Sequence, residues 1–220
     1  MKRIWGISAV VLLALVLVLA PMGTAKADNQ KGWYVGLFAG YVIPDDLEAE
    51  DPVGTTEFSL DNSYNLGIKG GYIFEGAPYL ALELEYNYMF AQDVDTQTVE
   101  DFNITGDDVT VSALMANLLF RYPGDWIRPY IGFGIGWAWI DVKLAGTEVG
   151  TGDSSTLDES DNDWAWQFLV GVNFAFAKNW SADVGYRYFA AENFSISEEG
   201  SDTDVKYKNS MVTVGINYHF

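Results

Sequence analysis

The chain has 220 residues and no cysteine, and its 31 acidic residues against 12 basic ones give a formal net charge of −19. This charge makes nucleic acid and other polyanions poor partners, and the lack of cysteine leaves no disulfide framework. A mean hydropathy of +0.03 excludes a bundle of transmembrane helices, although an aromatic content of 15% is high for a soluble chain. Both values suit a membrane barrel, in which only every second strand residue faces lipid.

Residues 1–27 have the parts of an export signal. Lys2 and Arg3 give a basic start, Ile7–Ala20 is an apolar run, and a small-x-small cleavage site ends at Ala27. We predict cleavage there, which leaves residues 28–220 as the barrel domain. The alternative, an uncleaved transmembrane helix, is at the short end of the roughly 17–25 residues that a span needs. The leader carries three basic residues, so the mature chain keeps 12 − 3 = 9 basic residues and a net charge of −22.

Eight segments rich in aromatic and β-branched residues follow, joined alternately by tight turns and long acidic loops. This rhythm predicts an all-β fold, an eight-stranded antiparallel up-and-down transmembrane β-barrel. No linker or change in composition divides the segments, so we expect one domain. In chain order the predicted strands are Gly32–Ile43, Ser63–Phe74, Tyr79–Phe90, Val109–Tyr122, Arg128–Val142, Trp164–Phe176, Trp180–Phe189 and Ser210–Phe220.

The third predicted strand shows the alternation that supports a barrel. Leu80, Leu82 and Leu84 share one face, while Glu83 and Glu85 share the other. A soluble β-sandwich also alternates, but its polar faces would carry Lys and Glu on most strands. Here the polar faces hold few charges and many Gly, Ala, Asn and Ser residues, which suits the narrow interior of an eight-stranded barrel.

The connections sort into two kinds, and so do the aromatic residues. Short turns are predicted at Glu75–Pro78, Pro123–Ile127 and Ala177–Asn179, and long loops at Pro44–Asn62, Ala91–Asp108, Lys143–Asp163 and Ala190–Asn209. In such barrels short turns face the periplasm and long loops face outward, so an even strand count places both termini in the periplasm. Aromatic girdles are expected beside the turns (Trp33, Tyr34, Tyr72, Phe74, Tyr79, Tyr122, Tyr130, Phe174, Phe176, Trp180, Tyr218, Phe220) and beside the loops (Tyr41, Tyr64, Tyr88, Phe90, Trp137, Trp139, Trp164, Trp166, Tyr188, Phe189).

Four segments combine aromatic residues and glycines in recurrent patterns: Gly32-Trp33-Tyr34-Val35-Gly36, Arg128-Pro129-Tyr130-Ile131-Gly132-Phe133-Gly134-Ile135-Gly136, Gly185-Tyr186-Arg187-Tyr188 and the closing Tyr218-His219-Phe220. These segments resemble the OmpA-like outer-membrane β-barrel family of Gram-negative bacteria. The resemblance covers the mature chain and implies an outer-membrane location, contact with outer-membrane lipid and lipopolysaccharide, and a monomer. It also assigns Phe220 to the signal read by the barrel-assembly machinery, although Phe220 suits a girdle aromatic equally well. We expect no peptidoglycan-binding domain after Phe220, so wall anchoring is not carried over from the family.

Six charged residues take the inward parity of their strands. A charged side chain in lipid near the midplane would cost about 2–4 kcal/mol, so these residues belong in the interior. Three positive and three negative charges cancel, which predicts a buried ion-pair network that plugs the barrel. Reading Glu83 and Glu85 as a general acid/base pair is the weaker alternative, because ion-pair networks also gather carboxylates. The predicted network is Lys69, Glu83, Glu85, Arg121, Asp183 and Arg187.

The single histidine, His219, argues against catalysis. It lies beside the C-terminus, and neither of its sequence neighbours is a serine that it could activate. We therefore expect no enzyme activity.

The four long loops hold 24 of the 31 acidic residues, which concentrates nearly all of the excess negative charge on one side of the membrane. Such a surface should attract cations. Two clusters offer hard oxygen ligands for a loosely bound Ca²⁺ or Mg²⁺, though without the spacing of a calcium loop, and no other cofactor is expected. The alternative is a solvated surface that binds nothing specifically. The candidate ligands are Asp45, Asp46, Glu48, Glu50, Asp51, Asp158, Glu159, Asp161 and Asp163.

These observations favour an outer-membrane protein with a structural and surface-interaction role. A divalent cation or a cationic partner would bind its loops. The alternative is a narrow gated channel for ions or small solutes, although an eight-stranded interior leaves little room for a pore.

Overall fold

The computed structural model describes residues 31–45, 47–51, 54–58, 61–93, 98–99, 102–104, 108–148, 154–198 and 201–220, and the side chains of residues 31–45, 61–91, 110–141, 162–191 and 207–220. The predicted leader and its cleavage site lie outside these ranges. Within them, no helix is long and apolar enough to cross a membrane.

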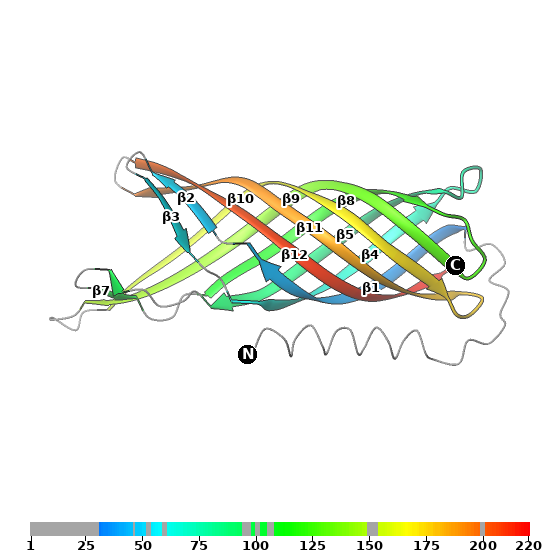
Figure 1. Cartoon of the computed structure of the whole chain (residues 1–220), viewed down its shortest axis with the longest axis horizontal. Helices are drawn as coiled ribbons and strands as arrows, with labels where there is room; N and C mark the ends of the chain where they lie inside the picture. The colour runs from blue at the N-terminus through cyan, green and yellow to red at the C-terminus, as the bar shows by residue number, and fades with distance from the viewer. Residues whose placement is uncertain are drawn as a thin grey trace.

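Eight long antiparallel strands form a closed barrel (Figure 1). Each strand pairs with the next one along the chain, and the last strand pairs with the first, from Tyr34↔His219 to Pro44↔Asn209. The predicted fold class and strand count are confirmed. The barrel strands are β1 (Gly32–Pro44), β4 (Ser63–Ile73), β5 (Leu80–Asp93), β8 (Asp108–Arg121), β9 (Ile127–Glu148), β10 (Ser154–Ala175), β11 (Trp180–Glu198) and β12 (Ser201–His219).

The two ends of the barrel differ, as the connections predicted. At the turn end, which also holds the C-terminus, short turns join β4 to β5, β8 to β9 and β10 to β11 (Figure 1). At the opposite end, the loop end, four short strands lie within the long connections. They are β2 (Leu47–Asp51), β3 (Gly54–Phe58), β6 (Thr98–Val99) and β7 (Phe102–Ile104).

Strands β9 to β12 extend far beyond their predicted bounds at the loop end. Two segments predicted as loops, Lys143–Asp163 and Ala190–Asn209, are mostly paired strand. The β9–β10 ladder runs unbroken from Ile127↔Phe174 to Thr147↔Ser154. The prediction ended these strands where their outward apolar residues end, but backbone pairing continues without them because hydrogen bonding needs no apolar face.

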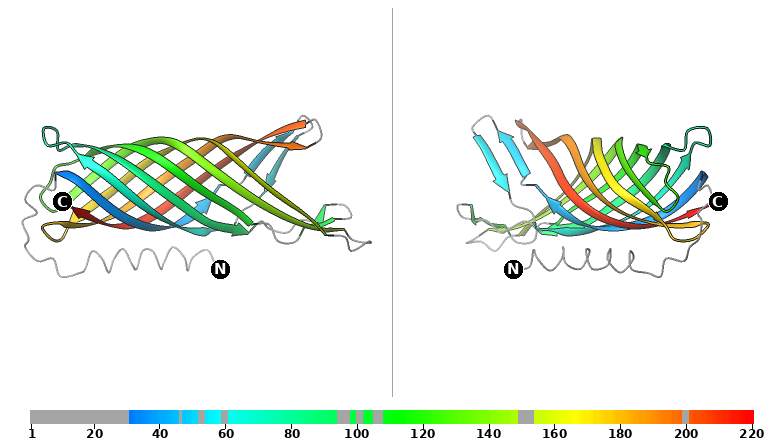
Figure 2. Two further views of the ribbon diagram at one scale, coloured as in Figure 1. Left: turned by 180° about the vertical axis from the view of Figure 1, so that it is seen from behind. Right: turned by 45° about the vertical axis from the view of Figure 1, so that its right-hand side comes forward.

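The extended strands pair with short strands at the loop end, which enlarges the same sheet. Strand β2 pairs with β12, β3 pairs with β2, and β7 pairs with β9. Figure 2 shows these short strands standing away from the closed part of the barrel. A transmembrane strand needs only about 9–11 residues, whereas β9 and β10 have 22 residues each. Roughly half of each strand therefore extends beyond a bilayer-spanning length.

Side chains alternate between an apolar outer face and a mixed interior. Leu37, Ile68 and Leu84 are more than half exposed, while Lys69 and Glu83 on the same strands are buried. Most predicted girdle aromatics lie on the outer face, and several pack in pairs, such as Trp33 with Tyr72 at 5.0 Å between ring centroids and Trp137 with Trp164 at 4.0 Å.

Three predicted girdle aromatics lie in the interior instead. Tyr34 and Phe189 are buried, and Tyr130 packs against the interior cluster that contains Tyr34. These residues were predicted to belong to the girdles because they lie at strand ends. Whether a side chain points outward or into the barrel depends instead on its odd or even position along the strand. Trp33 and Ile131 point outward, so their neighbours Tyr34 and Tyr130 point inward.

Interior glycines make room for these rings. A Cβ on Gly67 would overlap the ring of Phe38, its partner across the β1–β4 ladder. A Cβ on Gly171 would lie 2.6 Å from the Tyr130 hydroxyl. Small residues and large rings thus alternate around a narrow interior, which fills it with side chains.

Candidate functional site: the interior of the barrel

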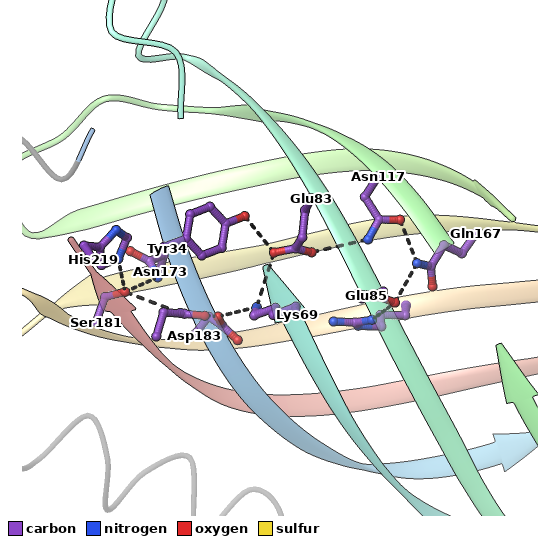
Figure 3. A network of polar contacts seen from close by, with 12 residues as sticks. Tyr34, Lys69, Glu83, Glu85, Asn117, Gln167, Asn173, Ser181, Asp183 and His219 are labelled. Atoms are coloured by element: carbon purple, nitrogen blue, oxygen red, sulfur yellow. Dashed lines mark hydrogen bonds and ion pairs between the residues drawn. The ribbon is translucent and has the colours of Figure 1, made fainter. Parts of the chain in front are cut away.

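The six charged residues predicted for the interior lie on four strands of the barrel wall. Lys69 lies on β4, Glu83 and Glu85 on β5, Arg121 on β8, and Asp183 and Arg187 on β11. All except Arg121 are buried. Figure 3 shows the labelled members of this group pointing into the space between the strands.

Lys69 holds two carboxylates on opposite sides of the interior. Its Nζ lies 2.8 Å from Asp183 Oδ1 and 3.8 Å from Glu83 Oε2. Two neutral groups complete the arrangement, because the Tyr34 hydroxyl donates to Glu83 at 2.7 Å and Asn217 Nδ2 donates to Asp183 at 2.8 Å. Each of the two buried carboxylates therefore has an opposite charge and a second hydrogen-bond donor, which is what burial of ions requires.

A second ion pair lies between Arg187 and Glu85. Arg187 Nη1 donates to Glu85 Oε1, and both side chains are buried. Gln167 Nε2 donates to the same oxygen at 2.8 Å. The guanidinium also lies over the Phe38 ring, 4.2 Å from its centroid, so the pair is fixed by stacking as well as by charge.

Arg121 stands apart from both ion pairs. It makes no ion pair with a carboxylate among the described residues, although it lines the same interior space as Lys69, Glu83 and Asp183. The structure thus brings five of the six predicted residues into ion pairs, whereas Arg121 at the turn end of β8 forms none with the carboxylates that the structure describes.

Several polar residues of the network were not predicted from the sequence. Their inward parity can be read from the sequence, but their contacts depend on the register between strands, as in the pairs Glu83↔Asn117 and Ser181↔Asn217. Asn117 Nδ2 donates to Glu83 at 3.3 Å, and Gln167 Nε2 donates to Asn117 Oδ1 at 2.8 Å. These amides connect the two ion pairs into one continuous network (Figure 3). The interior residues that complete it are Tyr34, Asn117, Gln167, Asn173, Ser181, Asn217 and His219.

The sequence argument that His219 has no serine nearby is wrong. Ser181 Oγ lies 2.9 Å from His219 Nε2, because the β11–β12 ladder brings the two residues together at the turn end. A hydrolytic triad also needs an acid on Nδ1 and an accessible serine. Here Nδ1 has no hydrogen-bond partner among the described residues, and Ser181 is 0% exposed. The pair therefore lacks the geometry for nucleophilic catalysis.

The half of the interior toward the loop end is mainly apolar, although Ser63, Asn65, Asn87 and Asn209 are buried there as well. Its residues lie at the loop ends of the strands, and the largest, Met89, Met115, Met211, Phe189 and Tyr207, are at most 1% exposed. Asn209 Nδ2 approaches Met89 Sδ at 3.4 Å, so a polar side chain here points to a thioether. Among the described side chains, the interior therefore has a charged half toward the turn end and a mainly apolar half toward the loop end.

The predicted cation ligands lie at the loop end and are separated by strand geometry. Asp158 and Glu159 occupy consecutive positions of β10 and so lie on opposite faces, while Glu159, Asp161 and Asp163 share one face. Asp158 is opposite Lys143 in the β9–β10 register, and Lys143 is opposite Asp108 on its other side. The register therefore pairs the Asp158 position with a lysine position, not with a second acidic one.

The other predicted cluster lies on and before β2. Glu48 and Glu50 share one face of β2, Asp51 is on the other, Asp45 is exposed before the strand, and Asp46 lies outside the described residues. Among side chains that the structure describes, no group of three His, Cys, Asp or Glu residues could hold a metal ion.

Phe220 lies on the outer face at the turn end. It is 72% exposed, its ring packs against Tyr218 at 5.3 Å, and its backbone N–H donates to the Trp33 carbonyl at 3.1 Å. This position is that of a girdle aromatic. Its role as an assembly signal stays a prediction.

Comparison with known proteins shows which family this chain is similar to. The family described as "Outer membrane protein beta-barrel domain" matches residues 11–220. Over 171 residues the chain is 28% identical to outer membrane protein PagN of Salmonella typhimurium, which covers 70% of this chain and 72% of PagN.

Two solved structures share the fold. The outer membrane protein OprG from Pseudomonas aeruginosa superposes with a TM-score of 0.60 at 15% identity, covering 88% of this chain and 99% of OprG. Neisserial surface protein A superposes with a TM-score of 0.53 at 18% identity, covering 86% of this chain and 97% of that one. At these identities the likeness concerns the fold alone.

Proposed function

Because the chain belongs to the outer membrane protein β-barrel domain family, we propose that this outer-membrane protein has a structural and surface-interaction role rather than an enzymatic one. In the proposed orientation the turn end and the termini face the periplasm, and the loop end faces outward. The barrel-assembly machinery inserts the chain, and outer-membrane lipid and lipopolysaccharide surround it as a monomer.

The extension of the barrel beyond a bilayer-spanning length supports this proposal most directly. Strands β9 to β12, joined by β2, β3 and β7, form a sheet at the loop end, where most of the acidic residues lie. The interior is meanwhile occupied by ion pairs and apolar side chains. A surface for binding is therefore available outside the membrane, whereas space for chemistry or transport inside the barrel is small.

The register of this sheet suggests where a cation binds. Glu48 of β2 is opposite Lys206 of β12 on one side and Glu57 of β3 on the other. Glu50 is opposite Asp204. Residues directly opposite each other share a face, so four acidic positions and one lysine lie on one face of three neighbouring strands. Like charges in this arrangement repel, and a divalent cation or a cationic partner would relieve the repulsion.

Calorimetric titration of the refolded protein with calcium and with magnesium tests this function. We expect a saturable heat that is lost in a Glu48→Gln/Glu50→Gln variant. The matched control is Glu75→Gln, an exposed acidic residue at the turn end, and it should leave the heat unchanged. No heat at millimolar ion would refute cation binding, and equal loss in both variants would refute its location.

A narrow gated channel is the second candidate, since the polar network is continuous across much of the interior (Figure 3). Conduction would require the Lys69 and Arg187 ion pairs to open and the apolar half to admit water, and hydrophobic constrictions resist wetting. Planar-bilayer recording separates the two functions. A reproducible open state that changes in Lys69→Met or Glu83→Gln would favour the channel, and an electrically silent protein would exclude it.

A further inference from the structure

Strands β10 and β11 separate at the loop end, and each then has a partner strand on one side only. Their shared ladder ends at Ala165↔Ala191. β10 nevertheless begins at Ser154, and β11 continues to Glu198. In these extensions β10 pairs with β9 and β11 pairs with β12, and no other strand that the structure describes pairs with them. Figure 1 shows the two hairpins diverging, with β9 and β10 running toward β7, and β11 and β12 toward β2 and β3.

A β-bulge explains why the two strands part at this point. The β11–β12 register shifts between Ala191 and Phe194, so β11 contains an extra residue there. A bulge bends its strand and increases the local twist. The bend begins directly after Ala191, the last β11 residue that pairs with β10. The separation is therefore built into the register of the sheet, and it leaves two strand edges at the loop end.

Of these two edges, the edge of β10 is the better template for a further strand. An edge strand presents a row of backbone N–H and C=O groups with which an extended peptide can pair. The β9–β10 ladder is unbroken over residues 154–161, so this edge is regular, whereas the β11 edge starts at the bulge. Strand β3 also pairs on one side only, but it is shorter, with five residues. Residues 154–161 contain neither lysine nor proline, the residues that commonly protect an edge from pairing.

The charge of the two segments limits the kind of partner. Residues 154–161 include Asp158, Glu159 and Asp161, and neither this segment nor residues 192–198 contain a lysine or an arginine. A second copy of this chain would bring an equally acidic edge, and like charges opposite each other destabilise a strand pair. Opposite charges stabilise it, so a basic partner strand fits this edge.

The spacing of the acidic positions adds a requirement for the partner sequence. Glu159 and Asp161 are two residues apart in β10 and share one face of the strand. Residues of a partner strand lie opposite them with the same period, so its basic residues should alternate with other residues. Every ladder of this sheet is antiparallel, and antiparallel pairing is slightly the more stable kind.

We propose that the loop end binds an extended basic segment of another protein, which adds as an antiparallel strand to the β10 edge at residues 154–161. Backbone hydrogen bonds hold the segment, and lysine or arginine at alternate positions selects it. The inference rests on the proposed surface-interaction role, and its site is separate from the cation position on β2.

Three synthetic peptides test the mode of binding. The first consists of Lys-Val repeats as long as this edge. The second has the same composition with all lysines at one end, and the third is the repeat peptide N-methylated at every residue. Fluorescence anisotropy in a non-ionic detergent should show that the repeat peptide binds the refolded protein on the order of tenfold more tightly than the second peptide. The third peptide keeps the charge but has no backbone donors, so it should not bind. Equal affinities would mean general charge attraction and would overturn the proposal, as would no binding of the repeat peptide.

Amide hydrogen exchange, followed by mass spectrometry, locates the bound peptide. Exchange at residues 154–161 should slow when the Lys-Val repeat peptide binds, because an added strand protects edge amides. Exchange in β2 and β3 should stay unchanged. Protection that appears only at β3, or binding without protection at residues 154–161, would overturn the site.

A pair of matched variants tests the contribution of charge. Glu159→Gln/Asp161→Asn should weaken binding of the repeat peptide on the order of fivefold, since two cross-strand charge pairs are lost. Glu48→Gln/Glu50→Gln removes the same formal charge from β2 and should keep the affinity. Equal loss in both variants would refute the location. If the first variant does not refold, the three peptides and hydrogen exchange of the wild type decide the question.

Calcium titration separates this inference from the cation site. A protein that binds the repeat peptide but gives no heat with calcium would support strand addition and refute cation binding. A protein that gives the heat but does not bind the peptide would refute strand addition alone.

Discussion

Arg187 offers the sharpest test of whether the interior ion pairs hold the barrel together. Replacing it with Met keeps much of the side-chain length and removes the charge. Among the described residues, Glu85, which is 1% exposed, then retains only the hydrogen bond from Gln167 at 2.8 Å. The stacking of the guanidinium on Phe38 is lost as well.

The expected cost follows from the burial of the remaining carboxylate. Removing one partner of a buried ion pair typically costs about 3–5 kcal/mol, because the other charge is left uncompensated. For a chain of this size, that corresponds to a decrease of about 6–20 °C in the unfolding midpoint. Lys178→Met removes an exposed cation and should change stability by no more than about 0.5 kcal/mol.

A double-mutant cycle separates the ion pair from the general effect of mutation. Glu85→Leu together with Arg187→Met removes both charges, and the double variant should be more stable than Arg187→Met alone. Urea unfolding in detergent, followed by tryptophan fluorescence, gives the four free energies. The reasoning fails if Arg187→Met is as stable as Lys178→Met, or if the double variant shows simple additivity. Arg121→Met should cost less than Arg187→Met, because Arg121 has no carboxylate partner among the described residues.

Three further predictions concern packing and the loop end. Gly67→Ala should lower the free energy of unfolding by about 1–3 kcal/mol, because its Cβ would overlap the Phe38 ring. Gly76→Ala, whose Cβ would have no neighbouring atom within 4 Å, should leave it unchanged. Equal urea midpoints of the two variants would contradict this. Met211→Ala should cost about 2–5 kcal/mol through a cavity in the apolar half, and a cost no larger than that of Leu37→Ala on the outer face would show that this half is loosely packed. Lys143→Glu places a third acidic residue between Asp108 and Asp158 in the register. Amide hydrogen exchange should therefore become faster at the loop ends of β8, β9 and β10, while the unfolding midpoint of the barrel stays unchanged. Unaltered exchange would mean that these register pairs do not interact.

Alternation along each strand was enough to predict the barrel and its inward residues. Lys69, Glu83 and Arg187 could be assigned to the interior from parity alone, because a side chain's face depends only on its position within one strand. Which of them meet could not be predicted. Lys69 is 114 residues from Asp183, and their contact depends on the tilt and register of the whole barrel. The same dependence hid the contact between Ser181 and His219, which lie 38 residues apart.

The strand bounds failed at the loop end for a different reason. Apolar periodicity reports the part of a strand that faces lipid, and it stops at the girdle near Trp139 and Trp164. The backbone ladder of β9 and β10 continues to Thr147↔Ser154, although the β10 positions that share the parity of Trp164 are polar from Ser154 to Asn162. Sequence patterns of this kind therefore mark the membrane boundary better than they mark the end of a strand.

The pairing of β12 with β1 has a consequence for how the barrel folds. Its outermost register pair, Tyr34↔His219, joins positions 219 − 34 = 185 residues apart. All other ladders between barrel strands join neighbours in the chain and can form as hairpins. Closure is thus the one long-range step, and its loop-closure entropy makes it late and slow. Until it occurs, β1 and β12 both expose unpaired backbone edges, so a variant that weakens this seam should accumulate an open, aggregation-prone sheet.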